Sequence, residues 1–113
     1  MERLTKLVQA LDSKHVTDLV VIDMRKHSPL YDFMIVSTAP NPRIISGVLT
    51  ELKAISKEPN FELKFIEGHN SGEWVLADFK HVIVHVFTQE MRDKYNLERL
   101  WKDADRISTE GMI

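Results

Sequence analysis

The chain has 113 residues, the usual size of one compact domain, and its 43% hydrophobic and 28% charged residues are typical of a globular protein. This composition excludes disordered, collagen-like and coiled-coil chains, and the absence of cysteine excludes disulfide frameworks and cysteine-ligated metals. The 15 Lys and Arg residues against 17 Asp and Glu residues give a net charge of −2, so no overall positive charge attracts nucleic acid.

The first half of the chain predicts two helices and two strands. Apolar residues recur at the i, i+3, i+4 and i+7 spacing of an amphipathic helix over residues 2–13. Residues 18–24, apolar on both faces, predict a buried strand, and residues 33–37 predict a second one. The pair Asn41-Pro42 predicts the start of a helix, because Asn accepts hydrogen bonds from free amides and Pro fits the first helical position. Pro59 marks the end of that helical region.

The second half predicts three strands followed by a helix. Residues 62–66 read as a strand, and residues 73–79 and 81–87 as two more. The last two strands are joined too tightly for a crossover helix, so they should form an antiparallel hairpin. From Gln89 onward the spacing of large apolar residues predicts helix.

This order of elements predicts an α/β or α+β fold, in which five strands form one mixed sheet flanked by helices. No linker divides the chain, so residues 1–104 should make a single domain. Residues 105–113 have weak periodicity, and we expect them to fray. The polar residues 69–71, between Gly68 and Gly72, favour a turn.

Targeting and membrane-spanning signals are missing from the pattern. The first six residues mix charged and apolar side chains and lack the apolar core of a signal peptide. The longest apolar run covers residues 19–22, far short of a membrane span. We therefore expect a cytoplasmic protein with no membrane partner.

Candidate catalytic residues are sparse. His81 and His85 would lie on one strand face about 13 Å apart, which is too far to share a metal ion. Asp23 and Asp32 could approach each other at adjacent strand ends and hold Mg²⁺ or act in acid–base chemistry. Two aspartates among 17 acidic residues are a weak signal, however. No serine lies in a Gly-x-Ser-x-Gly motif and no Gly-x-Gly occurs, so the sequence predicts no catalytic residue, cofactor or metal ion.

Aromatic residues with a polar group gather in the second half of the chain. Trp74, Tyr95 and Trp101 all fall between residues 72 and 102. Such residues are frequent at protein interfaces, although composition alone favours a role in the core. Trp74, Leu76 and Asp78 alternate along one strand, so they should project from the same face.

The same region resembles a known family. Residues 67–68, 72–79, 82–87 and 92–101 are similar to the central signature and the ending of the ribosomal silencing factor S family, also called Iojap-like. The likeness extends over about residues 4–104. The chain departs from the family at Lys80-His81, where members usually carry a glycine and an acidic residue at the hairpin turn.

The resemblance implies a nucleotidyltransferase-like fold without the catalytic motifs of active nucleotidyltransferases. It further implies a translation repressor that binds the large ribosomal subunit through ribosomal protein fourteen and sterically blocks joining of the small subunit. The resemblance implies no catalytic turnover, no cofactor and no sequence-specific nucleic-acid binding.

The partner-binding residues that the resemblance and the alternation together suggest lie between the third predicted strand and the last helix. They are Glu67, Trp74, Leu76, Asp78, His85, Tyr95, Leu97, Glu98 and Trp101. The residues from Tyr95 onward either extend the binding surface or brace it from behind. Two alternatives stay open: an enzyme of nucleotidyltransferase type that uses Asp23 or Asp32, and a self-associating module that forms a homodimer.

Overall fold

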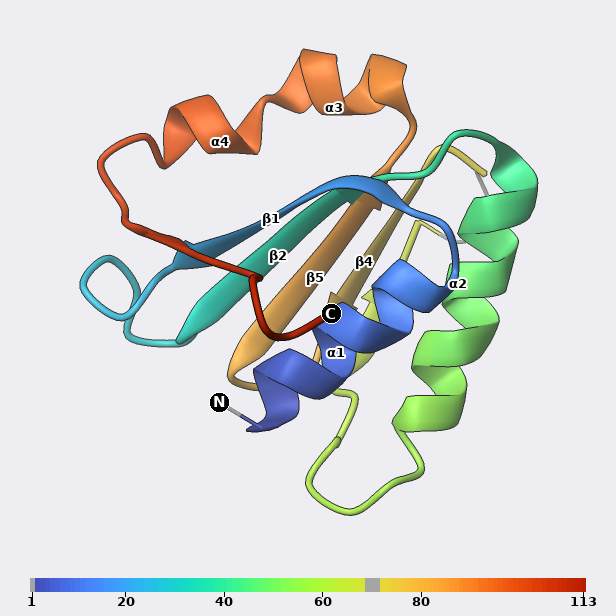
Figure 1. The fold of residues 1–113 in the computed structure, drawn as a ribbon, viewed down its shortest axis with the longest axis horizontal. Helices are drawn as coiled ribbons and strands as arrows, with labels where there is room; N and C mark the ends of the chain where they lie inside the picture. Colours follow the sequence, from blue (N-terminus) through green and yellow to red (C-terminus); the bar gives the residue numbers. More distant parts are fainter. Residues whose placement is uncertain (1, 69–71) are drawn as a thin grey trace.

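The computed structural model describes residues 2–68 and 72–113 and shows a sheet between two pairs of helices (Figure 1). Helices α1 (Glu2–Ser13) and α2 (Pro42–Ile55) lie on one side of the sheet. Helices α3 (Gln89–Tyr95) and α4 (Leu97–Leu100) lie on the other side. The turn predicted at residues 69–71 lies outside the described residues.

The sheet has six strands in the order β3-β4-β5-β2-β1-β6. The strands are β1 (Thr17–Asp23), β2 (Phe33–Thr38), β3 (Phe65–Glu67), β4 (Trp74–Asp78), β5 (Val82–Phe87) and β6 (Arg106–Ile107). Strands β2 and β5 pair in parallel and the other pairs are antiparallel, so the sheet is mixed. The α+β fold and the hairpin of β4 and β5 are confirmed, and one strand is added to the five predicted.

Helix α2 begins at the Asn41-Pro42 pair, as the sequence predicts. The Asn41 Oδ1 atom accepts a hydrogen bond from the backbone N–H of Ile44 at 3.0 Å, and Pro42 occupies the first helical position. The helix ends at Ile55, before Pro59. The capping pair therefore fixes where α2 begins, while the proline lies beyond its end.

Each face of the sheet has its own core. On the side of α1 and α2 the core is almost entirely aliphatic, and α1 contributes Leu4, Leu7 and Val8 at 1% exposure or less. On the side of α3 and α4 the core contains Ile22, Met34 and Phe87, with partly buried aromatic residues packed around it. The alternation predicted along β5 is confirmed, since its valines and its larger side chains point to opposite cores.

The sixth strand lies in the segment that the sequence predicted to fray. Residues 106–107 pair with β1, and the Asp23 N–H donates to the carbonyl of Asp105 at 2.8 Å. Beyond the strand, Met112 is 9% exposed against the core, and its carbonyl accepts from Gln9 Nε2 of α1 at 2.7 Å. The difference arises because the outer edge of β1 offers unpaired backbone groups, which a two-residue strand satisfies without any sequence periodicity.

The turn between β4 and β5 has a glycine-like backbone at Lys80, where the chain departs from the family. This residue has a φ of 78°, in the left-handed region that favours glycine. Its N–H donates to Asp78 Oδ1 at 2.7 Å, which supports the turn from inside the hairpin. The turn therefore has a backbone suited to the family's usual glycine, although a lysine occupies it.

Candidate functional site

A small apolar pocket opens where the ends of β4 and β5 meet the junction of α3 and α4. Its volume is about 250 Å³ and its lining consists of Trp74, His85, Phe87, Tyr95 and Leu97. All of these except Phe87 were predicted to bind a partner. Phe87 was missed as a site residue, although it alternates with His85 along β5 and pairs with Trp74 in the sheet. The alternation of Phe87 with His85 along the strand was the sequence signal that could have identified Phe87 as a site residue.

Three rings follow one another along one wall of the pocket. The ring centroids of His85 and Phe87 are 5.6 Å apart with 15° between the planes. Phe87 and Tyr95 follow at 6.1 Å and 25°. The stack ends at the surface, because Tyr95 is 54% exposed. A folded monomer thus leaves a large aromatic ring half open to solvent.

The imidazole of His85 is part of the apolar wall. It is 8% exposed, and burial lowers its pKa from 6.5 to about 4. The ring is therefore neutral near pH 7, and the pocket carries no charge from it. A partner surface entering the pocket would meet carbon and a neutral ring.

The apolar surface continues from the pocket across the edge of the sheet. Leu76 pairs with Glu67 of β3, so their side chains lie on the same face as Trp74. Phe65, two residues before Glu67, is 44% exposed on that face. We call the pocket together with Phe65, Glu67 and Leu76 the hairpin face.

A glycine allows Trp74 to lie where it does. Gly68 has a φ of 86°, and a Cβ atom there would stand 2.5 Å from the indole ring of Trp74. Any other residue would displace that ring. Gly68, in the Glu67-Gly68 pair that resembles the family's signature, thus has a physical role, because it leaves room for the Trp74 ring.

Asp78 does not belong to the exposed surface, which corrects the expectation from alternation. It lies on the same face as Trp74 and Leu76 but is only 3% exposed. Its carboxylate accepts hydrogen bonds from the Tyr31 hydroxyl and the Lys80 N–H. Burial and this hydrogen bond raise the pKa of Tyr31 to about 12. Tyr31, in the loop before β2, covers Asp78, so this carboxylate supports the hairpin and is not displayed at the surface.

Glu98 and Trp101 are not among the residues that line the pocket. Glu98 pairs with Arg92, whose guanidinium is 2.8 Å from the carboxylate. Trp101 is partly buried against the second core, and its ring meets that of His27 edge-on at 6.1 Å. Both residues hold α4 against the sheet, whereas Tyr95 and Leu97 line the open pocket.

The carboxylates considered for catalysis are not assembled into a site. Asp23 forms an ion pair with Arg25 at 2.7 Å, and the hydrogen bonds from Arg25 lower the pKa of Asp23 to about 2. Asp32 is exposed in the loop just before β2. Within residues 2–68 and 72–113, no group of three or more His, Asp or Glu side chains could hold a metal ion. The two aspartates therefore have no described ligand set around them.

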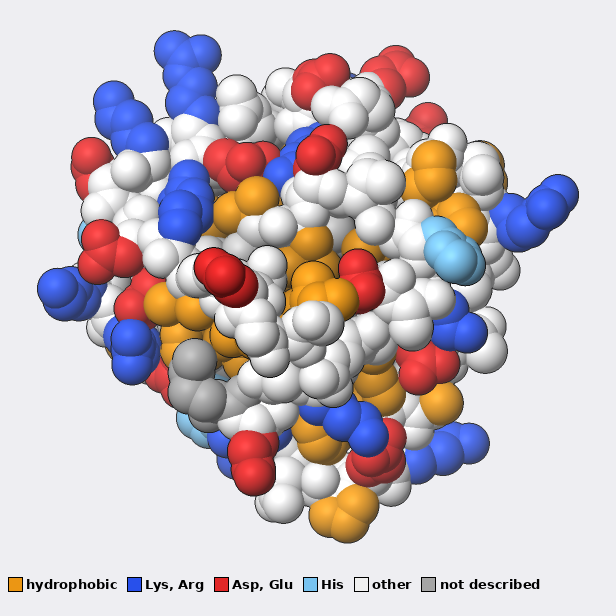
Figure 2. All heavy atoms as spheres, in the orientation of Figure 1, with side chains coloured by type: hydrophobic (Ala, Val, Ile, Leu, Met, Phe, Trp, Pro, Cys, Tyr) orange, Lys and Arg blue, Asp and Glu red, His pale blue; other side chains and the backbone are white. Residues whose placement is uncertain are grey.

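The charges on the surface are mixed. Figure 2 shows Lys and Arg side chains interspersed with Asp and Glu side chains over the face seen in Figure 1. This side of the molecule offers no continuous basic patch of the kind that attracts nucleic acid. In the described part of the chain, none of the helices has the length and apolar character that crossing a bilayer would require.

Comparison with known proteins supplies the family. A family model described as "Ribosomal silencing factor during starvation" matches residues 1–112. The chain belongs to this family. The ribosomal silencing factor of Halalkalibacterium halodurans is 36% identical to it over 112 residues, which cover 99% of this chain and 96% of the relative.

Two crystal structures agree with the fold. A protein from Chromobacterium violaceum superposes with a TM-score of 0.83 at 33% identity, covering 90% of this chain and 86% of that one. A protein from Bacillus halodurans superposes with a TM-score of 0.82 at 32% identity, covering 96% and 99%. The chain thus shares the sequence and the fold of the ribosomal silencing factor family, which is non-enzymatic.

Proposed function

We propose that this silencing factor binds the large ribosomal subunit through ribosomal protein fourteen and thereby blocks joining of the small subunit. The hairpin face is the contact surface. The observation that carries the proposal is the pocket of about 250 Å³, which combines apolar walls with the exposed ring of Tyr95. Half-buried aromatic residues around a pocket are typical of the residues that dominate binding energy at interfaces.

The charges around the pocket support a protein partner. Glu67 is exposed beside Leu76, and the Lys94 Nζ atom lies 5.8 Å from the centroid of the Tyr95 ring. Charges at the rim of an apolar contact orient an encounter more than they strengthen it. With Asp78 buried, Glu67 is the carboxylate of the predicted set that is free to meet a basic partner surface.

Sedimentation with separated ribosomal subunits tests the proposal. We expect the protein to sediment with large subunits and not with small subunits or joined ribosomes, and to reduce subunit joining when added first. Leu76→Lys should lose this binding, because it places a charge in the apolar contact. Leu30→Lys is the control for an added surface charge: Leu30 is 70% exposed in the loop between β1 and β2, at the end of the sheet opposite the pocket.

If both lysine variants lose large-subunit binding equally, or both bind equally well, the assignment of the contact to the hairpin face is contradicted. Binding to naked ribosomal RNA as strong as to the subunit would contradict a protein-mediated contact. Trp74→Ala adds a second test, since a partly buried interface tryptophan should cost about 2 kcal/mol or more in binding. A thermal melt separates that effect from loss of fold.

Self-association is a second proposal that one observation favours. Strand β3 forms an edge of the sheet, has only three residues and exposes Phe65. An apolar edge strand can pair with a second copy of the chain. Light scattering of the free protein tests this, with Phe65→Lys expected to shift a dimer toward monomer.

A further inference from the structure

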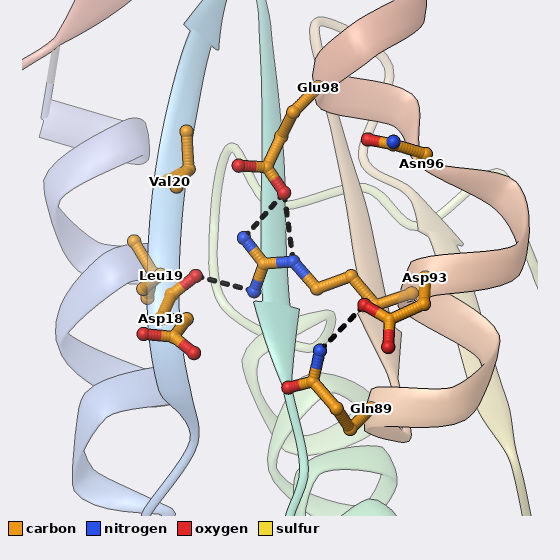
Figure 3. A pocket seen from close by; sticks show the side chains of 8 residues that line it. Asp18, Leu19, Val20, Gln89, Asp93, Asn96 and Glu98 are labelled. Atoms are coloured by element: carbon orange, nitrogen blue, oxygen red, sulfur yellow. Dashed lines mark hydrogen bonds and ion pairs between the residues drawn. The ribbon is translucent and has the colours of Figure 1, made fainter.

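The side chain of Arg92 in α3 binds groups from three other elements, and two of these partners, Asp18 of β1 and Glu98 of α4, are labelled in Figure 3. Only 7% of the residue is exposed. Its Nη1 atom donates to the carbonyl of Asp18 at 2.6 Å and to Thr38 Oγ1 at 2.8 Å. One guanidinium therefore joins α3 to β1 and β2.

The other side of the same guanidinium holds α4. Arg92 Nε and Nη2 both reach Glu98 Oε1, at 2.9 and 2.8 Å. The contact thus depends on a single oxygen of Glu98 and on the planar fork of Arg92. Asn96, between the two helices, has a φ of 41° and donates its N–H to the Arg92 carbonyl at 2.8 Å.

The bulge in β1 prepares the site for this arginine. Pairing between β1 and β2 is irregular from Thr17 to Val20, and Asp18 within it has a φ of 49°. A bulge leaves a backbone group out of the ladder, and here the Asp18 carbonyl finds its partner in Arg92. Without Arg92 the bulge would lose the partner of its Asp18 carbonyl, and without the bulge the buried guanidinium would lose an acceptor. Either loss would cost free energy of folding.

These contacts fix the junction between α3 and α4, and the two residues that flank this junction line the pocket. Tyr95 is the last residue of α3 and Leu97 the first of α4, so the path of the chain through Asn96 sets their separation. The two helices have only seven and four residues, too few to be stable without such support. We propose that Arg92 and Glu98 are positioning residues for partner binding, and that Glu98 acts through Tyr95 and Leu97 rather than by contacting the ribosome.

This inference rests on the proposed function, because the effect is measured as affinity for the large subunit. Its sharpest test compares two replacements of Glu98. Glu98→Gln keeps an oxygen at the position that accepts both bonds from Arg92 but removes the charge. Glu98→Ala removes both the oxygen and the charge.

We expect Glu98→Gln to bind large subunits within about threefold of the parent and Glu98→Ala to bind about tenfold more weakly, since a partner must then reorder the junction itself. The Asn96 amide should exchange faster in Glu98→Ala than in Glu98→Gln. Asp93→Ala is the matched control on α3: Asp93 accepts a hydrogen bond from Gln89 Nε2 of its own helix at 2.8 Å, and its loss should leave binding and exchange unchanged.

Equal weakening by Glu98→Gln and Glu98→Ala, with a reduced salt dependence in both, would show a direct charge contact and overturn the inference. Unchanged binding by Glu98→Ala would overturn it as well. If Glu98→Ala fails to fold, Glu98→Asp, which shortens the side chain by one methylene, replaces it with the same expected loss. Failure of the parent to bind large subunits overturns the proposed function first and this inference with it.

Discussion

The two faces of the sheet differ in how completely helices cover them. On one face, α1 and α2 have 12 and 14 residues and close an aliphatic core. On the other face, α3 and α4 have only seven and four residues and leave Tyr95 and Leu100 at 54% and 69% exposure. The closed face contains the larger part of the buried core, whereas the open face also displays aromatic surface that folding alone does not require. Changes to buried residues on either face should therefore alter stability, and changes to exposed residues of the open face should alter binding.

The largest expected effect on stability comes from the closed face. Leu52 of α2 is fully buried in the aliphatic core. Leu52→Ala should lower the free energy of unfolding by about 2–5 kcal/mol through lost burial and a cavity. Chemical denaturation measures this loss. Affinity for large subunits per folded molecule should not change, and a reduced affinity would show that the two faces are coupled.

Acid should destabilise the open face through His85. The unfolded chain binds a proton near the ordinary pKa of 6.5, but the folded chain does so only near 4. The free energy of unfolding should therefore fall as the pH drops from about 6.5 toward 4, by up to about 3 kcal/mol. His85→Leu should remove most of this slope in denaturation curves recorded across that range. If the free energy of unfolding of the variant still falls over this pH range, the effect comes from other titratable groups.

Replacing Asp78 tests whether a residue on the open face can contribute to stability without contributing to binding. Asp78→Ala removes the acceptor for the Tyr31 hydroxyl and the Lys80 N–H, and should cost about 2 kcal/mol of stability. Binding by the folded fraction should stay intact. Asp32→Ala, at an exposed aspartate, is the control and should change neither stability nor binding. Loss of binding by a stably folded Asp78→Ala would return this residue to the contact surface.

The smallest expected effect is a gain of stability on the closed side. Gly47 lies inside α2, and a Cβ atom there would meet nothing within 4 Å. Gly47→Ala should raise stability by about 0.5–1 kcal/mol, because alanine loses less backbone entropy in a helix. A shift in the denaturation midpoint measures it. Reduced large-subunit binding by this variant would mean that a partner approaches α2 closely.

Sequence reasoning succeeded where the signal was local and failed where distant segments meet. The capping pair before α2 and the alternation along β5 are local, and the structure has both as expected. Asp78 shares a face with Trp74 as predicted, but its burial depends on Tyr31, which is 47 residues away. Alternation assigns a side chain to a face and says nothing about what covers that face.

The same limit applied at the C-terminal end and inside the pocket. Strand β6 has only two residues, which is too short for any periodicity, so its pairing with β1 could not be read from the sequence. The helix expected from Gln89 onward is interrupted at Asn96, whose left-handed backbone separates α3 from α4. The closeness of Tyr95 and Leu97 to His85 arises from that interruption and from the tertiary contacts of Arg92.

Site-specific photo-crosslinking tests most directly whether the open face is the binding face. A photoreactive phenylalanine in place of Tyr95 would stand at the rim of the pocket, and the same residue in place of the exposed Thr50 would stand on α2. After illumination of each variant bound to large subunits, we expect the residue at position 95 to crosslink to ribosomal protein fourteen and the residue at position 50 to give no ribosomal product. Crosslinks from position 50 with none from position 95 would contradict the assignment of binding to the hairpin face.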